Sequence, residues 1–461
     1  MPKSPFARRD EERELSRRSL IRWTLAAGAG LGVARSRVHE VLEKHAGKGA
    51  ALAASKLAVC RSVHFHDGGG GLSNWTQVFP HVFWATNNTG TTPWARGNDG
   101  QLGTAMAGTA KAPLLSYNGN PFANIPVARQ VSCFMGGTNN THNQDANTST
   151  FGLGGVGLAA FSAKIQAASV SAVLPALAIS TAPGPAAVPF ASATNAAGAV
   201  NLFNSVASQA NGLLAIQGNA DLFAAHYDIL SALNRVAKDP VQAPSYKTAR
   251  DSARFIARNL AAQLTVTPAE LAEYGTGGSN AVTRVRQELA FAHKAFALGL
   301  TNCIALDGHR NDPHGYFDNG TAGTESVALR KVVETFFAKM AATTDPVSGE
   351  KLLDNFVFTV QGDTLKSYDN TAGWGDGTRN NSNAIFAYTS GWVKSGWHGK
   401  VTANAVTSVD DAGNEVAYNG AEGARKALSC IAYAMCKGDD RAAAEFTGNT
   451  VYKAGVNTAL L

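Results

Sequence analysis

The sequence has little charge: only 16% of its 461 residues are Asp, Glu, Lys or Arg. The first 53 residues hold eleven Lys or Arg and six Asp or Glu, and so carry +5 of the formal net charge of +6. The remaining chain is near +1, which argues against a nucleic-acid-binding surface. Its apolar content of 45% is nevertheless too high for a disordered chain.

Segments long and apolar enough to cross a membrane are missing after residue 53. The one earlier apolar run, 23–34, is twelve residues long, which is shorter than a bilayer needs. We therefore expect no transmembrane anchor in residues 54–461. Nucleotide-binding motifs are missing too, because Gly68 to Gly71 fit neither GxGxxG nor a Walker loop.

Cysteine is also scarce, and its spacing argues against a cysteine zinc site. The five cysteines include no CxxC pair, the spacing typical of such sites. Cys430 and Cys436 lie six positions apart in an expected helix, which is a poor geometry for a mutual disulfide. Cys60, Cys133 and Cys303 each lie in an apolar run, so we interpret them as buried thiols.

The N-terminus does contain a distinctive feature, a pair of arginines before the short apolar run. Arg17 and Arg18 lie in Ser-Arg-Arg-Ser-Leu-Ile-Arg, directly before residues 23–34. This order is typical of a signal read by the twin-arginine (Tat) export machinery, which carries folded proteins. We interpret 1–53 as the signal region, cleaved after Ala53, and expect a periplasmic or extracellular protein. The alternative is an amphipathic basic helix.

Strand-like and helix-like segments alternate along the rest of the chain. Short apolar runs that end in glycine or polar residues are typical of buried parallel strands. Six such runs stand at 57–65, 127–135, 169–179, 300–306, 355–360 and 383–389. The alternation predicts an α/β fold in which helices sandwich a mainly parallel sheet.

The expected helices show apolar residues at helical spacing. They span 196–216, 222–236, 246–264, 280–298, 325–340 and 422–436. Thr267-Pro268-Ala269-Glu270 adds a helix start, with Thr267 as N-cap and Glu270 three residues later. We expect a single domain over 54–461, with a helical insertion at about 196–298 because no clear strand interrupts that block.

Candidate ligands follow the expected strands at the ends where parallel sheets bind their ligands. These side chains are His64, His66 and Asp67, then His142 and Asp145, then the segment 307–314, then Asp363, and later His398. His64 and His66 alternate onto one face of a strand, which suits a ligand pair, although a structural role is favoured for His64. The glycines at 68–71 could let backbone N–H groups approach an anion.

The sharpest of these signals is the segment Asp307-Gly308-His309-Arg310-Asn311-Asp312-Pro313-His314. It places two carboxylates and two imidazoles in one short loop after a strand. Carboxylate with imidazole suits a divalent metal such as Zn or Mn, which could polarise an ester or generate a bound hydroxide. The alternative is a polar loop whose carboxylates cap the backbone.

The tryptophans outside the signal fall into two groups, each following expected strands. They are Trp75, Trp84 and Trp94 in one region, and Trp374, Trp392 and Trp397 in the other. Exposed rings in these loops could stack on sugars, but we favour the interpretation that they anchor loops in small apolar cores.

The order of these features resembles an uncharacterised family of Tat-exported bacterial proteins, a domain of unknown function placed beside the sulfatases and alkaline phosphatases. The likeness is clearest from Ala292 to Val401. There, Ala297-Leu298-Gly299-Leu300-Thr301 leads to Asp312-Pro313-His314-Gly315, which is similar to the family's Asp-Thr-His-Gly. Thr141-His142-Asn143-Gln144 resembles its Ser-His loop, and Trp392-Val393-Lys394-Ser395-Gly396 resembles its lysine-bearing turn.

The chain departs from the family pattern at several positions that hold metal in the wider superfamily. The family's Glu-Phe-Gly-Arg stands here as Gln361-Gly362-Asp363-Thr364, and its Asp-His pair falls near Arg379-Asn380. The acidic residue of the first glycine-rich turn is replaced by glycine. Asp67 and Asp363 are the candidates to substitute for the missing ligands.

The resemblance implies an alkaline-phosphatase-like sheet and a metal-dependent hydrolase of phosphate or sulfate esters, or a relative that has lost catalysis. The metal ligands would then be Asp67, Asp312, His314 and Asp363, and the acid or base His142 or His309. Ser73 and Thr76 are candidate nucleophiles, although no adjacent base singles either out. The other class of function is a non-catalytic cell-envelope protein that binds glycan or a protein partner.

Overall fold

A computed structural model describes residues 60–75, 78–79, 105–106, 110–111, 131–137, 157–169, 172, 174–181, 190–207, 260–312, 321–363, 365, 378–401 and 405–460. The chain divides into two units, Met1–Ala51 with Ala197–Thr265, and Leu52–Ala196 with Val266–Leu461. The first unit contains α9 (Leu260–Leu264) and most of α6 (Ala196–Ala207). The expected signal at 1–53 and the expected helix at 222–236 lie outside the described residues.

The second unit is built on an eight-stranded sheet of order β10-β4-β9-β8-β1-β7-β5-β6. Seven strands run the same way, and β9 alone of the eight is antiparallel to its neighbours. The strand bounds are β1 Arg61–Asp67, β4 Ser132–Met135, β5 Leu174–Ile179, β6 Ala191–Ala193, β7 Thr301–Leu306, β8 Phe356–Gly362, β9 Ala384–Tyr388 and β10 Gly396–His398. The mainly parallel sheet and all six expected strands are confirmed.

The central strands are buried on both faces, which explains their continuous apolar runs. In β1, Val63 lies opposite Ile304 of β7 and Phe358 of β8, and every residue of the strand is buried. A strand covered on both sides has no solvated face that would favour alternation with polar residues. The apolar run therefore predicted β1 correctly, although the strand starts four residues later than expected.

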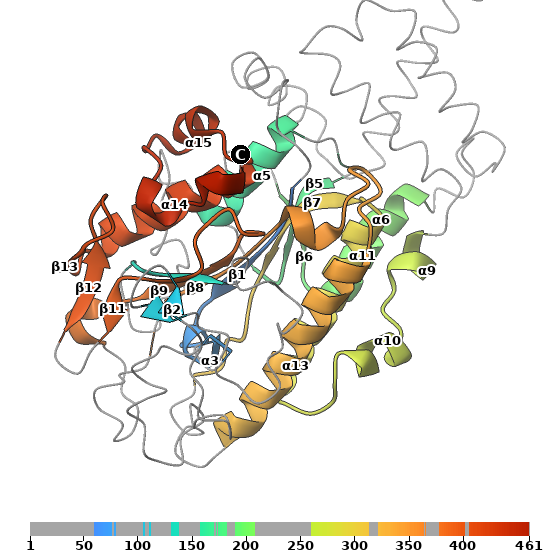
Figure 1. The fold of residues 1–461 in the computed structure, drawn as a ribbon. Helices are drawn as coiled ribbons and strands as arrows, with labels where there is room; N and C mark the ends of the chain where they lie inside the picture. The colour runs from blue at the N-terminus through green and yellow to red at the C-terminus, as the bar shows by residue number, and fades with distance from the viewer. Residues whose placement is uncertain are drawn as a thin grey trace, which may run out of the picture. The chain divides into compact units, whose positions relative to one another are not determined.

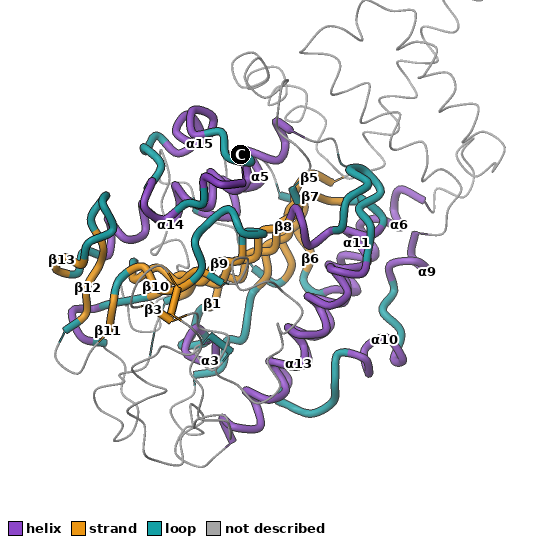
Figure 2. The backbone as a smooth tube through the Cα atoms, viewed as in Figure 1, coloured by secondary structure: helices purple, strands orange, loops and turns teal. Residues whose placement is uncertain are grey.

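Helices cover both faces of this sheet (Figure 1). One face carries α5 (Leu158–Ser169), α14 (Gly420–Met435) and α15 (Asp440–Thr447), and the other carries α11 (Asn280–Ala297) and α13 (Thr321–Ala342). Figure 2 shows the strands as one layer between them. The α/β class is thus confirmed. Helix α11 begins inside the expected insertion at 196–298, yet it belongs to the sheet unit and packs on β7.

The remaining elements are short. They include the helices α3 (Leu72–Trp75) and α10 (Pro268–Glu273). They also include the 3-10 turns η5 Leu352–Asn355, η6 Arg379–Asn381, η7 Lys453–Gly455 and η8 Thr458–Leu460. Two small sheets contain β2 Ala105–Met106 with β3 Ala110–Lys111, and β11 Lys400–Val401, β12 Val406–Val409 and β13 Glu415–Ala417. The capping box expected at α10 is present, because Thr267 and Glu270 exchange side-chain to backbone hydrogen bonds.

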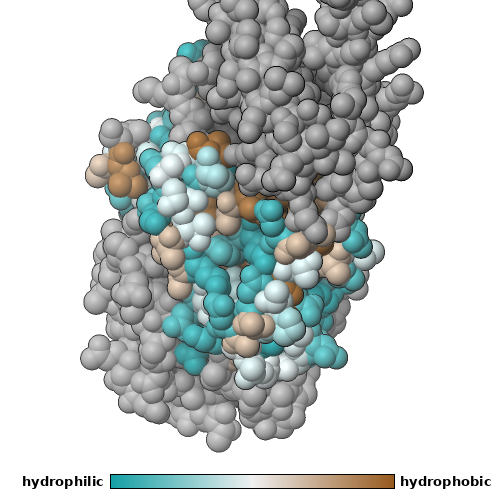
Figure 3. Space-filling view, turned by 90° about the vertical axis from the view of Figure 1, so that its right-hand side faces the viewer, coloured by the Kyte–Doolittle hydropathy of each residue, from teal (hydrophilic) through white to brown (hydrophobic). Residues whose placement is uncertain are grey.

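The surface seen from the right-hand side of Figure 1 is mostly hydrophilic in its described part (Figure 3). Among the described residues, the large hydrophobic side chains that are exposed are Val416 and Leu460. No described helix combines the length and apolar character needed to cross a bilayer. All five cysteines are free and buried, so the buried-thiol interpretation is confirmed.

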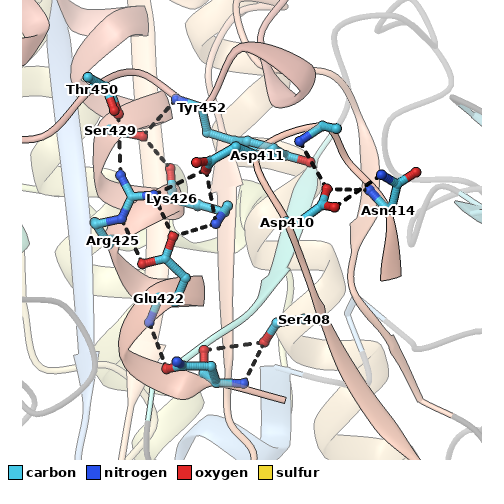
Figure 4. Close-up of polar contacts among 12 residues, drawn as sticks. Ser408, Asp410, Asp411, Asn414, Glu422, Arg425, Lys426, Ser429, Thr450 and Tyr452 are labelled. Atoms are coloured by element: carbon cyan, nitrogen blue, oxygen red, sulfur yellow. Dashed lines mark hydrogen bonds and ion pairs between the residues drawn. The ribbon is translucent and has the colours of Figure 1, made fainter. Parts of the chain in front are cut away.

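A polar cluster on α14 fixes the β12–β13 turn to the helix (Figure 4). The buried Lys426 ammonium lies 2.5 Å from Oε1 of Glu422 and 3.2 Å from Oδ1 of Asp411. The guanidinium of Arg425 contacts the same two carboxylates. The charges of the cluster are satisfied internally, so we assign it a structural role.

Candidate functional site

The carboxyl ends of β1, β7 and β8 lie side by side at one edge of the sheet, which we call the rim. The residues that follow these strands include Asp67 at the end of β1, Asp307 after β7 and Asp363 after β8. Strand order alone brings these three carboxylates to one edge, although the first two lie 240 positions apart in the chain. Loops at this edge of a parallel sheet are the usual place for a ligand.

Asp67 lies at the centre of the rim and is fully buried. Its Oδ1 accepts a hydrogen bond from the backbone N–H of His309. Oδ2 has no hydrogen bond of ordinary geometry among the described residues, although the nearby Trp75 side chain lowers the pKa of Asp67. Burial raises the pKa of Asp67 well above its usual range, against the lowering effect of the His309 N–H, and the charges of Asp307 and Asp363 raise it further. A cation beside Oδ2 would relieve this repulsion.

Asp363 and Asp312 meet Asp67 around the glycine turn at 68–71. Asp363 accepts hydrogen bonds from the N–H of Gly69 at 2.9 Å and of Gly70 at 3.3 Å. A Cβ atom on Gly70 would lie 3.2 Å from Cγ of Asp312. Three of the four residues expected to bind metal therefore each contact this turn. The N–H groups of the turn were expected to be able to approach an anion, and in the structure they bind the carboxylate of Asp363.

Asn383 holds the Asp363 segment in place, and sequence reasoning missed it. Its side-chain amide donates to the carbonyl of Gly362 at 2.9 Å, and its backbone N–H contacts the hydroxyl of Tyr418 at 2.9 Å. Asn383 immediately precedes β9. Because β9 runs opposite to its neighbours, its first residue lies at the rim, where the parallel strands end.

His309 forms a buried pair with Glu325 of α13, which sequence reasoning also missed. Nε2 of His309 lies 3.1 Å from Oε2 of Glu325, and Glu325 also accepts from the N–H and hydroxyl of Ser279, at 2.6 and 2.8 Å. Burial alone would raise the pKa of Glu325, but the hydrogen bonds from His309 and Ser279 outweigh it and lower it. An ionised Glu325 accepts, so the proton of the neutral imidazole is assigned to Nε2.

This assignment leaves Nδ1 of His309 as an unprotonated ring nitrogen, and it has no hydrogen-bond partner among the described residues. Burial lowers the pKa of His309, although Glu325 acts in the opposite direction. A neutral imidazole oriented by a carboxylate is one feature of a general base, although the His309 ring is fully buried.

Asp307 forms ion pairs with two arginines. Its carboxylate lies 2.5 Å from Nε of Arg310 and 3.6 Å from Nη2 of Arg284. Burial raises its pKa to about 6, against the two guanidinium groups. For Asp307, the structural alternative of a polar loop thus has direct support. In the same segment, the backbone N–H of His309 binds Asp67, and Asp312 lies against Gly70.

Two predicted site residues, His142 and His314, lie outside the described residues, as do Asp145 and Thr76. Among the residues that the structure does describe, no group of three or more His, Cys, Asp or Glu side chains is placed to hold a metal ion. Oδ2 of Asp67 and the neighbouring carboxylates supply suitable oxygen donors. These donors alone do not complete a metal site, and the fourth expected ligand, His314, lies outside the described residues.

Other candidates have structural roles. Nδ1 of His64 lies 2.7 Å from the hydroxyl of Thr359, which supports the structural interpretation of His64. His398 stacks on Phe134 with ring centroids 4.3 Å apart, and Ser73 is buried in α3.

The three described tryptophans pack against other aromatic rings. Trp75 contacts Phe65 at 4.8 Å between ring centroids, Trp397 contacts Phe386 at 6.1 Å, and Trp392 contacts Tyr433 at 6.0 Å. The anchoring interpretation is confirmed for these three, and Trp84, Trp94 and Trp374 lie outside the described residues.

The chain matches no protein-family model, no curated protein and no solved structure. The resemblance to the Tat-exported family therefore stays a prediction, and the functional argument depends on the rim itself.

Proposed function

We propose that the rim is the active site of an exported, metal-dependent hydrolase of phosphate or sulfate esters, with an alkaline-phosphatase-like arrangement of its sheet. The proposal depends on one observation: Asp67, Asp312 and Asp363 each contact the glycine turn, next to the backbone of His309. Export is supported by the arginine pair Arg17-Arg18 and the apolar run behind it.

The roles of the residues follow from their chemistry. Asp67, Asp312 and Asp363, with His314, would hold a divalent ion such as Zn or Mn, which supplies electrostatic stabilisation of the ester's developing charge. His309, oriented by Glu325, takes a proton from the attacking water at Nδ1. His142 remains a second candidate for acid or base. Asn383 positions Asp363 through the backbone of Gly362.

Metal binding by the purified protein tests this proposal. Titration with Zn²⁺ or Mn²⁺, followed by calorimetry and elemental analysis, should give a stoichiometric complex, and Asp312→Asn should weaken it at least about tenfold. The matched control is Glu334→Gln, which removes an exposed carboxylate on α13 and should bind metal as the wild type does.

Hydrolysis of 4-nitrophenyl phosphate and 4-nitrophenyl sulfate by the metal-loaded protein is the second readout. Activity that Asp312→Asn abolishes and Glu334→Gln retains supports the proposal. A protein that binds neither ion, or an Asp312→Asn variant with unchanged affinity, contradicts the metal site. A stable, metal-free and inactive protein would instead favour the non-catalytic envelope role.

A further inference from the structure

Two arginines lie at the rim, and both contact the side chain of Asp307. Arg310 belongs to the segment that follows β7, and Arg284 belongs to α11. Nε of Arg310 lies 2.5 Å from Oδ1 of Asp307, and Nη2 of Arg284 lies 3.6 Å from Oδ2. The two guanidinium groups are therefore close enough together for one small anionic group to contact both.

Contacts with the backbone hold both arginines beside the segments that enclose Asp67. A Cβ atom on Gly71 would lie 2.6 Å from the backbone nitrogen of Arg310, so Arg310 packs directly on the glycine turn. Nη2 of Arg284 donates to the carbonyl oxygen of Gly308 at 2.6 Å. Gly308 in turn packs on the carboxylate of Asp67, which an added Cβ atom would overlap. The arginine pair is thus part of the rim rather than of a distant surface.

The arginines are the accessible part of this cluster. The side chains of Arg284 and Arg310 are 31% and 44% exposed, whereas that of Asp307 is 2% exposed. Asp67 is fully buried. An anion that approaches from solvent therefore meets the two guanidinium groups before it meets either of these carboxylates.

Both guanidinium groups retain hydrogen-bond donors for a further acceptor. Each guanidinium has five N–H donors in a planar fork, and a carboxylate pairs with two of them at most. Arg284 and Arg310 share the single carboxylate of Asp307, and Arg284 donates in addition to Gly308. Phosphate and sulfate oxygens are acceptors that match the geometry of the fork.

The charge of the cluster favours an anion. With Asp307 ionised, the two arginines and Asp307 carry a net charge of +1. A further carboxyl group, Glu288 of α11, is 1% exposed and contacts the hydroxyl of Ser180 at 3.0 Å. Burial raises the pKa of Glu288 to about 8, although Arg284 and Ser180 lower it. Glu288 therefore does not cancel the positive charge at pH 7.

We propose that Arg284 and Arg310 form a binding subsite for a tetrahedral oxyanion, phosphate or sulfate, at the exposed side of the rim. The subsite uses two side chains that the proposed hydrolysis leaves without a role. It rests on the proposed function only for the identity of its ligand, which is the anionic group of the ester. An anion held there lies at the segment that carries Asp312, two positions after Arg310.

Calorimetric titration of the full chain with inorganic phosphate, and separately with inorganic sulfate, tests the subsite. A chelator keeps the protein free of metal, so that the anion cannot bind through a metal ion. The wild type should bind one anion saturably, and Arg284→Gln and Arg310→Gln should each weaken this binding at least about tenfold. Lys400→Gln is the matched control, because it removes an exposed cation of β11 and should leave the affinity unchanged.

Two further variants separate anion binding from folding. Asp307→Asn removes the carboxylate that competes for the same guanidinium groups, so the anion should bind about tenfold more tightly. Arg310→Lys keeps the charge beside Asp307 but loses the planar fork, so the anion should bind less tightly than in the wild type. Partial unfolding would weaken binding in both variants and cannot produce these opposite changes.

The outcomes that overturn the subsite differ from those that overturn the proposed function. A wild type that binds neither anion saturably contradicts the subsite, and so does an Arg310→Gln or Asp307→Asn variant with wild-type affinity. If phosphate binds as expected but the metal-loaded protein does not hydrolyse 4-nitrophenyl phosphate, the subsite stands and the proposed function is wrong. Hydrolysis by a protein that binds neither free anion contradicts the subsite alone.

Discussion

Glycine residues enclose Asp67 so closely that no other residue fits at three positions around it. A Cβ atom on Gly308 would overlap the Asp67 carboxylate, one on Gly362 would overlap its backbone carbonyl, and one on Gly71 would lie 2.8 Å from Oδ1. Gly308 also has a φ of +54°, which disfavours any side chain. The rim therefore depends on backbone segments that approach a buried carboxylate directly.

The substitution Gly308→Ala tests this enclosure. Left-handed strain and overlap with Asp67 together should lower the free energy of unfolding by about 2–5 kcal/mol. Gly277→Ala is the matched control, because Gly277 has a φ of +86° but no atom within 4 Å of the added Cβ. The control variant should lose only the free energy of unfolding that left-handed strain costs, about 1–2 kcal/mol. Chemical denaturation measures both, and equal losses would contradict the packing argument.

At the same scale, the site was only partly predictable from the sequence. Asp67, Asp312 and Asp363 were identified because each lies in the segment at or after the end of an apolar run, and strand ends gather at one edge. Glu325 and Glu288 were not, since a glutamate inside an amphipathic helix gives no signal that it is buried. Their partners come from other segments, and only the fold brings them together.

At the scale of elements, apolar runs predicted strands well wherever the strands are buried on both faces. β6 and β10 were missed because each has three residues, and β6 is a partly exposed edge strand. The direction of β9 was not predictable either, because its apolar run is indistinguishable from that of a parallel strand. The start of α10 was predicted correctly because its capping box is local in sequence.

A buried ion pair connects two such elements at the opposite end of β1. Nε of Arg61 in β1 lies 2.8 Å from Oδ2 of Asp345, in the loop after α13, and Nη1 also donates to the carbonyl of Thr301 in β7. Both side chains of the pair are almost fully buried. Water therefore cannot stabilise either charge once its partner is removed.

We predict that Asp345→Ala lowers the free energy of unfolding by about 3–5 kcal/mol, because it leaves the Arg61 guanidinium buried and uncompensated. The double variant Arg61→Met/Asp345→Ala removes both charges and should lose less than the single variant. Urea denaturation of the three proteins forms the comparison. If the double variant is the less stable one, the cost arises from packing rather than from the unpaired charge.

At the scale of the whole molecule, the small net charge leaves buried and half-buried histidines as a main source of acid sensitivity. Burial lowers the pKa of His64 to about 3 and those of His293 and His398 to about 4, from an ordinary value of 6.5. Between these lowered pKa values and 6.5, the unfolded chain thus binds protons that the folded chain does not bind. Glu288 acts in the opposite sense, since the folded chain binds its proton more tightly between its ordinary pKa of 4.5 and about 8.

Lowering the pH from about 6.5 to 4 should therefore destabilise the fold, with each of the three histidines contributing up to about 1.4 kcal/mol per pH unit. Above 6.5 their contribution is fully present and does not change. The variant His293→Gln keeps a polar group beside Thr343, the hydrogen-bond partner of His293, while removing one titrating site. Its stability should fall less steeply with acid than that of the wild type, as urea denaturation at a series of pH values would measure. Parallel curves for the two proteins would show that His293 is protonated equally in the folded and unfolded states and would contradict its burial as a neutral group.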